Sequence, residues 1–483
     1  MIRLTSIELN GFKNVAHGEV SLSSWKKGDS IPEADIVGIY GQNGSGKTSV
    51  IQALKILKSV FVGNSIQQDT ADCVSKTSES AEIVVKGVLF DDDQSALTSF
   101  VYAMSFIESG KGPMLLGEKI SCKDLDQSDD SHKPDTMRVL FSYSLRNTPP
   151  LAYEIKPKEF WHDLMALSED AKTEMAVSQR LASANFSSLL FSNDFVTLLH
   201  NLSQAAKAKA EKTEAEHDWR NSALSMQLSN VVLSLQLFAL TDLAVIGASQ
   251  YAGPMLNVLR ISTHEGETGA LADTSFVVDL SQPAKLDAKR LNILRTTVEK
   301  MSPVLSALVP GLSLGVISLG KLMNDDGSIV ESVEITCTRG KTTVPLRCES
   351  EGIKKLVSIL TLLIDVYSKP GACVAIDELD AGVFEFLLGE ILQVLQNHGR
   401  GQLIFTAHNL RPLETLNKGA LVFTTTNPDR RYIKFRGSRE KSNLRSQYLR
   451  AINLGGQPEK VYEPTNAFDI DSAFYDSGFP EEE

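Results

Sequence analysis

The stretch that decides the fold is Gly41-Gln-Asn-Gly-Ser-Gly-Lys-Thr48, which matches the phosphate-binding loop pattern GxxxxGK[ST]. The apolar residues 36–40 before it predict a buried strand, and residues 49–57 after it predict a helix. In that setting the backbone N–H groups of the loop and the helix N-terminus surround a polyphosphate. We expect Lys47 to reach the β- and γ-phosphates and Thr48 to give its hydroxyl to Mg²⁺. The alternative, a glycine-rich turn with a chance lysine, is disfavoured by this strand–loop–helix context.

A second apolar run ends in two acidic residues. Residues 372–376 read Ala-Cys-Val-Ala-Ile and are followed by Asp377 and Glu378, which predicts a buried strand with carboxylates at its end. Downstream of a P-loop, Asp377 is predicted to hold the Mg²⁺ shell and Glu378 to orient and activate the attacking water. Adjacent acids after an apolar strand are common by themselves, so the catalytic interpretation depends on the motifs around them.

Those motifs come in a fixed order. Ser350-Glu-Gly352 opens a helix-compatible stretch over 353–366, and Leu379-Asp380-Ala381-Gly382 follows the acidic pair. A further helical stretch leads to residues 402–407, an apolar strand pattern that ends at His408.

In this order the motifs resemble the ABC-type ATPase head shared by the SMC, RecF and OLD proteins, over residues 1–110 and 290–450. The resemblance implies an α/β fold, a P-loop NTPase with an ABC-ATPase head (a mixed sheet with helices) and a helical insertion. It assigns Ser350 and Gly352 to the signature motif, Asp380 to the D-loop and His408 to the switch histidine. The opening residues 4–14, Leu-Thr-Ser-Ile-Glu-Leu-Asn-Gly-Phe-Lys-Asn, resemble the first strand and turn of RecF-like heads.

The resemblance also implies how the site works. Two heads pair head-to-tail, and the signature of one closes over the ATP of the other, so that ATP joins the subunits and hydrolysis loosens them. The implied cofactors are ATP and Mg²⁺, and the implied catalytic residues are Lys47, Glu378 and His408. The predicted nucleotide contacts are Asn43, Gly44, Ser45, Gly46, Lys47, Thr48, Ser49, Ser350, Gly352 and Asp380; the predicted metal contacts are Thr48 and Asp377.

The chain departs from the family pattern in two places. Glu351 stands where many members have glycine, although the signature serine and second glycine remain. The Q-loop has only Gln67 and Gln68 as candidates, in a polar segment. Ser350 also fits an ordinary helix N-cap, a position that favours serine.

Composition places the chain among globular proteins. It has 483 residues, of which 42% are apolar and 22% charged, so one to three domains are expected. The five cysteines show no metal-ligand spacing, which indicates reduced thiols, and the N-terminus lacks a signal pattern. The most apolar stretch, residues 231–247, is broken by Gln236 and Asp242, which predicts no membrane span. We expect a cytoplasmic protein without a membrane partner.

Charge is uneven along the chain. The net charge is −12, which argues against a surface made for nucleic acid throughout. Residues 430–450 nevertheless form a basic cluster that could meet phosphates or an acidic protein, or be a solvated face at a subunit contact. Its members are Arg430, Arg431, Lys434, Arg436, Arg439, Lys441, Arg445 and Arg450, against the single acid Glu440.

Motif order predicts the domain organisation. Residues 1–110 form the N-terminal lobe with the P-loop, and residues 111–285 form an insertion. Residues 286–450 form the C-terminal lobe with signature, acidic strand, D-loop and switch histidine, and residues 451–483 form a tail. Within the insertion, polar residues 108–135 predict a loop, and the Ala/Lys/Glu-rich residues 204–219 with the apolar helix through 240 predict an exposed helical hairpin.

Sites for other chemistry are missing from the sequence. Only 75 residues follow His408, too few for the Toprim nuclease that follows the ATPase of OLD nucleases. Asp469-Ile-Asp471 imitates a DxD pair but has no upstream glutamate strand, and Asn417-Lys418 is followed by Gly-Ala instead of the GTPase pattern. We therefore expect no nuclease site in this chain, and any nuclease or toxin activity to come from another chain.

A compact head without a nuclease resembles the stand-alone OLD-like ATPases of bacterial anti-phage systems, among them the ATPase subunits of PARIS and Septu and those associated with retrons. The resemblance implies a switch or scaffold that forms homodimers or larger homo-oligomers and controls a separate effector, a nuclease toxin. The trigger it implies is a phage protein or DNA. The alternative is a RecF- or SMC-like repair ATPase that binds DNA. A transporter subunit is disfavoured by the opening Leu-Asn-Gly-Phe-Lys-Asn pattern and by the roughly 300 residues between P-loop and signature.

Overall fold

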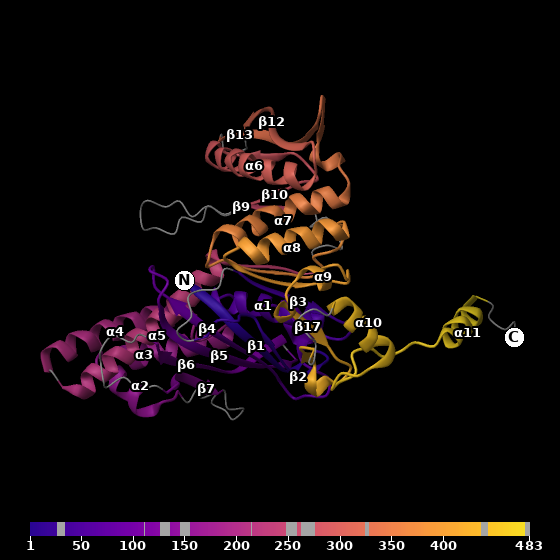
Figure 1. Ribbon diagram of the computed structural model, residues 1–483. Coiled ribbons are helices and arrows are strands. Elements are labelled where there is room, and N and C mark those ends of the chain that lie inside the picture. Colours follow the sequence, from indigo (N-terminus) through magenta and orange to yellow (C-terminus); the bar gives the residue numbers. More distant parts are fainter. Residues whose placement is uncertain are drawn as a thin grey trace.

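The computed structural model describes residues 1–26, 34–110, 112–125, 136–144, 155–213, 215–247, 258–261, 276–323, 328–435 and 443–478. These residues form a body of two sheets around one helix, a helical layer beside it, and a smaller α/β module above it (Figure 1). The architecture is mixed α/β, as expected.

The P-loop sheet has the strand order β18-β17-β3-β16-β15-β8. All neighbouring strands are parallel except the pair β17–β18. The strands are β3 (Asp35–Tyr40), β8 (Leu243–Ile246), β15 (Cys373–Ile376), β16 (Gln402–Thr406), β17 (Leu421–Thr424) and β18 (Tyr432–Ile433). Three of them, β3, β15 and β16, confirm the strands predicted at 36–40, 372–376 and 402–407. Their near-complete burial fits continuous apolar runs in a parallel sheet.

The second sheet is antiparallel, with the order β2-β1-β4-β5-β6-β7. Its strands are β1 (Ile2–Phe12), β2 (Val15–Ser21), β4 (Ala81–Phe90), β5 (Ala96–Ser109), β6 (Gly112–Asp124) and β7 (Arg138–Ser144). The predicted polar loop over 108–135 is therefore wrong over β6: alternating buried residues such as Leu115 and Ile120 pair this segment with β5. Residues 126–135 of that prediction lie outside the described residues.

Helix α1 (Lys47–Phe61) lies between the two sheets. Its apolar residues on both sides, such as Val50 and Leu57, belong to one core together with side chains of β1, β4, β15 and β16. The P-loop helix is thereby fixed by packing on both faces.

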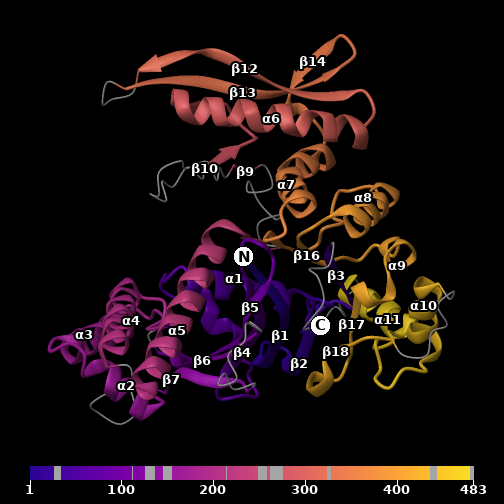
Figure 2. The same ribbon diagram turned by 60° about the vertical axis from the view of Figure 1, so that its left-hand side comes forward.

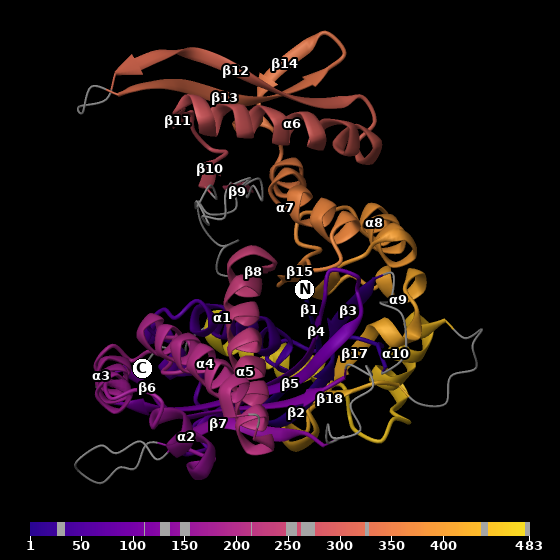
Figure 3. The same ribbon diagram turned by 90° about the vertical axis from the view of Figure 1, so that its left-hand side faces the viewer.

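A helical layer covers the antiparallel sheet (Figure 3). It contains α2 (Lys158–Met165), α3 (Ala171–Ala184), α4 (Asn193–Thr213) and α5 (Glu216–Thr241). Helices α4 and α5 form the predicted hairpin, and Ser203 Oγ of α4 donates to the carbonyl of Ser225 on α5 at 3.1 Å. The hairpin is less exposed than predicted, because Val231, Val232 and Leu235 of α5 are buried in the main core.

Helix α5 also bears on membrane insertion. In the described part of the chain it is the one helix long and apolar enough to cross a membrane, with a mean hydropathy of 1.5 over its most apolar window. Leu228, Val231 and Phe238 pack it into the core, as in a core helix.

The upper module lies above the P-loop sheet (Figure 2). A second core runs from this module through α7 and α8 to the P-loop sheet. The module contains β9 (Val258–Ile261), β10 (Phe276–Asp279), β11 (Ala284–Leu286), α6 (Ala288–Leu308), β12 (Leu312–Met323), β13 (Ile329–Arg339), β14 (Thr342–Pro345) and η4 (Leu346–Cys348). Helix α7 (Glu351–Ser368) connects this module to the P-loop sheet, beside α8 (Glu385–His398).

The C-terminal elements run along the β17 side of the body. They are α9 (Pro412–Thr415), η5 (Lys418–Ala420), η6 (Pro428–Arg430), α10 (Leu444–Leu454) and α11 (Ala467–Gly478). The predicted tail thus contains a helix, α11, which stands away from the body (Figure 1).

Candidate functional site

The P-loop lies between β3 and α1, as its sequence predicted. Gly44 and Gly46 have positive φ of 74° and 93°, which a side chain would oppose. Asn43 and Gly44 are exposed at the tip of the loop. Lys47 Nζ donates to the carbonyls of Gly41 at 2.8 Å and Gln42 at 3.1 Å, so its ammonium lies inside the loop. Burial lowers the pKa of Lys47, and the nearby carboxylates of Asp377 and Glu378 oppose this shift.

Tertiary structure brings the predicted metal contacts together. Asp377, at the end of β15, is fully buried; its Oδ1 accepts from Thr48 Oγ1 at 3.3 Å and from Thr406 Oγ1 at 2.5 Å. Its Oδ2 has no hydrogen-bond partner within the described structure. A buried carboxylate oxygen without a partner is costly, and the hydroxyl beside it adds a second hard oxygen donor. These two residues therefore fit Mg²⁺, which prefers such ligands.

Glu378 follows in a left-handed backbone conformation with φ of 49°, a sparsely populated region for a non-glycine residue that costs about 1–3 kcal/mol. Three contacts hold it there. Its N–H donates to Thr406 Oγ1 at 2.8 Å, its carbonyl accepts from Lys355 Nζ at 2.7 Å, and the next residue, Leu379, donates its N–H to the carbonyl of Thr406 at 3.0 Å. These contacts fix the backbone of the half-buried Glu378 next to Asp377.

Sequence reasoning missed Lys355. It lies on α7, is almost fully buried, and reaches the acidic strand from the helix that Ser350 opens. Burial lowers the pKa of Lys355 to about 8, against the opposing effect of the carboxylates of Asp380, Glu378 and Asp377. Its sequence signal was weak: a lysine on the buried side of an apolar helix.

The predicted D-loop and the predicted switch segment are joined by hydrogen bonds. Asp380 Oδ2 accepts from the backbone N–H groups of His408 at 2.8 Å and Asn409 at 2.7 Å. His408 itself is exposed at the end of β16. A carboxylate that binds two backbone N–H groups couples the position of the two loops.

The predicted signature segment begins α7 as a helix cap. Ser350 is the N-cap residue, and its hydroxyl oxygen accepts a hydrogen bond from the N–H of Ile353 at 3.4 Å. The alternative interpretation of Ser350 as a helix N-cap is therefore confirmed. Ser350 is also exposed. A Cβ on Gly352 would lie 2.4 Å from the carbonyl oxygen of Gly382, so this glycine is needed for close packing of signature and D-loop. Glu351 pairs with Lys354 at 2.6 Å.

Side chains from the β1–β2 turn and from residues 431–432 support the P-loop, which the sequence did not predict. Asn14 Nδ2, from the β1–β2 turn, donates to the carbonyl of Gly44, and Tyr432 donates its hydroxyl to the carbonyl of Gly46 at 2.7 Å. The buried Arg431 donates to the carbonyls of Thr425 at 2.6 Å and Asn14. The opening strand and β18 thus support the loop from below.

Three other described members of the basic cluster also have partners within the chain, whereas Arg450 is exposed on α10. Arg430 pairs with Glu459 at 3.0 Å, Lys434 donates to the carbonyl of Gly419, and Arg445 pairs with Glu414 at 3.0 Å. Arg436, Arg439, Glu440 and Lys441 lie outside the described residues. The described part of the cluster therefore supports the fold as well as adding charge.

The remaining candidates lie on exposed segments. Gln67 and Gln68 are exposed at the start of η1 (Gln68–Cys73). Asp469 and Asp471 lie on the exposed helix α11. Within the described ranges there is no group of three His, Cys, Asp or Glu side chains arranged to hold a metal ion.

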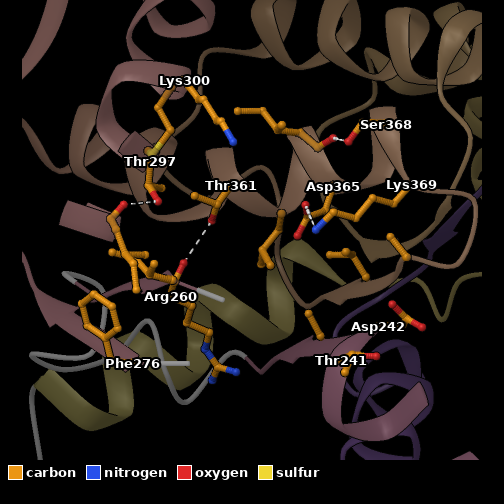
Figure 4. A pocket seen from close by; sticks show the side chains of 18 of the residues that line it. Thr241, Asp242, Arg260, Phe276, Thr297, Lys300, Thr361, Asp365, Ser368 and Lys369 are labelled. Carbon is orange, nitrogen blue, oxygen red and sulfur yellow. Dashed lines mark hydrogen bonds and ion pairs between the residues drawn. The ribbon is translucent and has the colours of Figure 1, made fainter. Parts of the chain in front are cut away.

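A separate cavity of about 650 Å³ lies between the β8 edge, α6 and α7 (Figure 4). Arg260, Lys300 and Lys58 contribute cations to its lining, and Asp365 pairs with Lys369 at 2.7 Å. Burial and the nearby Arg260 lower the pKa of Lys58 to about 8. None of the predicted site residues lines this cavity.

Several solved structures are similar to this chain at low identity. The SMC head of Pyrococcus furiosus, solved with an extended coiled coil and the C-terminal domain of ScpA, is 12% identical, with a TM-score of 0.39 over 90% of this chain and 96% of that one. The SMC head of Thermotoga maritima is 13% identical, with a TM-score of 0.34 over 90% and 100%. The recombination mediator RecF is 12% identical, with a TM-score of 0.33 over 85% and 94%. A search of curated protein sequences finds no match.

One protein-family model matches residues 36–413, more than half of the chain, from β3 before the P-loop to α9 after the switch segment. The model is described as an AAA domain, putative AbiEii toxin, type IV toxin–antitoxin system. The matched range contains the P-loop, the paired Thr48 and Asp377, and the Lys355–Glu378 contact; this chain belongs to that AAA domain family.

Proposed function

We propose that this protein is an ATP-hydrolysing switch that pairs head-to-tail through bound ATP and controls a separate effector in anti-phage defence. The observation that carries the proposal is the meeting of Thr48 and Asp377, 329 residues apart, with Asp377 Oδ2 buried and unpaired within the described structure. With Lys47 inside the loop, this arrangement fits ATP with Mg²⁺, whose charge neutralises the phosphates.

Hydrolysis needs a base beside the γ-phosphate. Glu378 follows the metal-binding aspartate and is held by Thr406 and Lys355, which supports its assignment as the water-activating residue. His408, whose backbone is bonded to Asp380, would contact the phosphate or the water from the next strand.

Pairing rests on the signature. Ser350 and Glu351 are exposed at the start of α7, and a helix N-terminus favours an anion. Since the D-loop packs on Gly352, a partner's nucleotide that contacts Ser350 would also meet the D-loop. We expect the homodimer, or a larger homo-oligomer, to form on ATP binding.

The effector is proposed on the family description, which names a toxin and a toxin–antitoxin system. We propose a separate nuclease toxin as the effector, a phage protein or DNA as the trigger, and the cytoplasm as the place of action. The alternative is a RecF-like repair ATPase. ATP-enhanced, salt-dependent DNA binding would favour it, whereas ATP-dependent release or capture of a toxin would favour the switch.

The decisive experiment mixes two inactive variants. Ser350→Arg should block the signature while leaving nucleotide binding by the single head intact, and Lys47→Ala should abolish that binding. In a head-to-tail pair of the two, one composite site has an intact P-loop and an intact signature, so partial ATP turnover should return. Lys55→Ala, on the same helix as Lys47, is the matched control.

Two results would contradict the proposal. Turnover by Ser350→Arg alone removes the signature assignment. If cross-linking shows that mixed oligomers form and they still do not hydrolyse ATP, the two sites do not act independently. Hydrolysis at one site would then require an intact second site.

A further inference from the structure

A segment near the C-terminal end of the chain lies against the P-loop. Gln42, the second residue of the loop, binds the backbone of Glu463 through its side-chain amide: Oε1 accepts from the N–H at 2.9 Å, and Nε2 donates to the carbonyl at 3.4 Å. A side-chain amide has a donor and an acceptor side by side, so it pairs with Glu463 as a neighbouring strand would. We name residues 459–463 the strap.

The strap is also held to the turn that follows β17. The carbonyl of Lys460 accepts from the N–H of Thr426 at 2.8 Å. The carboxylate of Glu459 accepts from Asn427 Nδ2 and from Arg430 Nη1, each at 3.0 Å. The strap therefore joins the beginning of the P-loop to this turn.

The residues that follow the turn bind the P-loop and its surroundings. Arg431 donates to the carbonyl of Asn14, and Tyr432 donates to the carbonyl of Gly46 at 2.7 Å. Within the strap, Val461 is buried, with 2% of its surface exposed. The strap is thus packed into the body at the point where the loop is supported.

The backbone of Gln42 contacts the inside of the loop. Its carbonyl accepts from Lys47 Nζ at 3.1 Å and from Ser45 Oγ at 2.5 Å. When ATP binds, we expect Lys47 to move to the β- and γ-phosphates. The hydrogen bonds from the side chain of Gln42 to the strap do not involve Lys47, so they can hold the start of the loop both with and without nucleotide.

We propose that the strap and Gln42 position the P-loop for nucleotide, so that this contact sets the affinity for ATP and leaves the rate of hydrolysis unchanged. The inference rests on the proposed binding of ATP at the P-loop. The phosphate contacts come from backbone N–H groups of the loop, and a loop held in shape beforehand loses less conformational freedom on binding. Gln42 is thus a positioning residue.

Gln42→Met tests the contact, because methionine keeps the length of the side chain without the amide donor and acceptor. The dissociation constant for ATP should rise at least about fivefold, since two hydrogen bonds that hold the loop are lost. The kcat at saturating ATP should change by less than about twofold. Gln204→Met, the same change at an exposed position on α4, is the matched control. An ATP dissociation constant equal to that of the control, or a loss in kcat alone, would overturn the proposal.

Val461→Ser loosens the strap from its buried side and leaves the P-loop sequence intact. It should raise the ATP dissociation constant by about the same factor as Gln42→Met. The double variant should bind ATP no more weakly than the weaker single variant, because both changes break one contact. Factors that multiply in the double variant would show that Gln42→Met acts on the nucleotide without the strap, and they would overturn the proposal.

Hydrogen exchange measures the reciprocal effect. By linkage, ATP must strengthen the strap contact as much as the contact strengthens ATP binding, and the N–H of Glu463 reports it because it donates to Gln42. With Glu378→Gln to keep ATP bound, ATP should slow exchange at this amide several-fold, and adding Gln42→Met should abolish the effect. If ATP binds and exchange at Glu463 does not change, the strap proposal fails and the proposed function stands. If the wild type does not bind ATP, both fail.

Discussion

Lys355 donates from Nζ to the carbonyl oxygen of Glu378 at 2.7 Å, which joins the helix opened by the signature to the acidic strand. Its ammonium is almost fully buried among Asp377, Glu378 and Asp380. Through this contact α7 directly restrains the backbone of Glu378, the proposed catalytic glutamate.

Lys355→Met should therefore lower turnover more than binding. Without the donor, the left-handed backbone at Glu378 loses one of its restraints, and we expect kcat to fall at least about tenfold, since misplaced catalytic groups cost on the order of a hundredfold. Nucleotide affinity should change by less than about threefold. Lys354→Met, which removes the neighbouring ion pair with Glu351, is the control; an unchanged kcat in folded Lys355→Met would exclude a positioning role.

The same lysine predicts a pH dependence of stability. Burial places the pKa of Lys355 in the folded protein at about 8, below the value of 10.5 for a free lysine side chain. Between these pH values Lys355 is mostly protonated in the unfolded chain and mostly neutral in the folded chain, so this group makes the free energy of unfolding rise with pH. The free energy of unfolding of the wild type, measured in denaturant titrations, should therefore rise relative to that of Lys355→Met between pH 8 and 10.5. A constant difference across that window would contradict the lowered pKa.

Glu378→Gln should separate binding from hydrolysis. The amide keeps the size of the side chain and removes the base, so hydrolysis should fall about 10²–10⁴-fold. ATP should still bind, and dimers should accumulate in mass photometry. Glu390→Gln, an exposed acid on α8, serves as control. Hydrolysis by Glu378→Gln at the parental rate would assign water activation to another residue.

Gly352→Ala should disturb the contact between signature and D-loop. The added Cβ would lie 2.4 Å from the carbonyl of Gly382, so the backbone must shift, and such overpacking costs about 1–3 kcal/mol. At Gly419 a Cβ meets nothing within 4 Å, and Gly419→Ala should change stability by less than about 1 kcal/mol. Thermal unfolding of both variants measures the difference in stability. Equal melting temperatures would show that the backbone around Gly382 can shift at little cost.

Arg431→Met should weaken the P-loop from below. Two hydrogen bonds from a buried guanidinium are lost, which should cost about 2–3 kcal/mol and lower ATP affinity. Arg450→Met, at an exposed position on α10, should leave both unchanged. If Arg431→Met has the free energy of unfolding and the ATP affinity of the wild type, Arg431 does not support the P-loop.

Local sequence patterns determined much of the secondary structure around the candidate site. The phosphate-binding loop, the strands on either side of it and the acidic pair Asp377-Glu378 follow from apolar periodicity and turn chemistry within short windows. The cap at Ser350 could be read from the sequence for the same reason. Polar composition was a poorer guide: β6 is polar enough to resemble a loop, yet pairing with β5 makes it a strand, because cross-strand partners outweigh intrinsic preference.

Tertiary structure alone decided which motifs meet. Thr48 reaches Asp377, Gln42 binds Glu463, and Lys355 contacts Glu378 because the parallel order of β3, β16 and β15 and the packing of α7 bring distant segments together. Such contacts leave no periodic signal in the sequence, since each partner is set by where the sheet places the other. The sequence by itself determined the chemistry available at the site, and the sheet order determined which side chains share it.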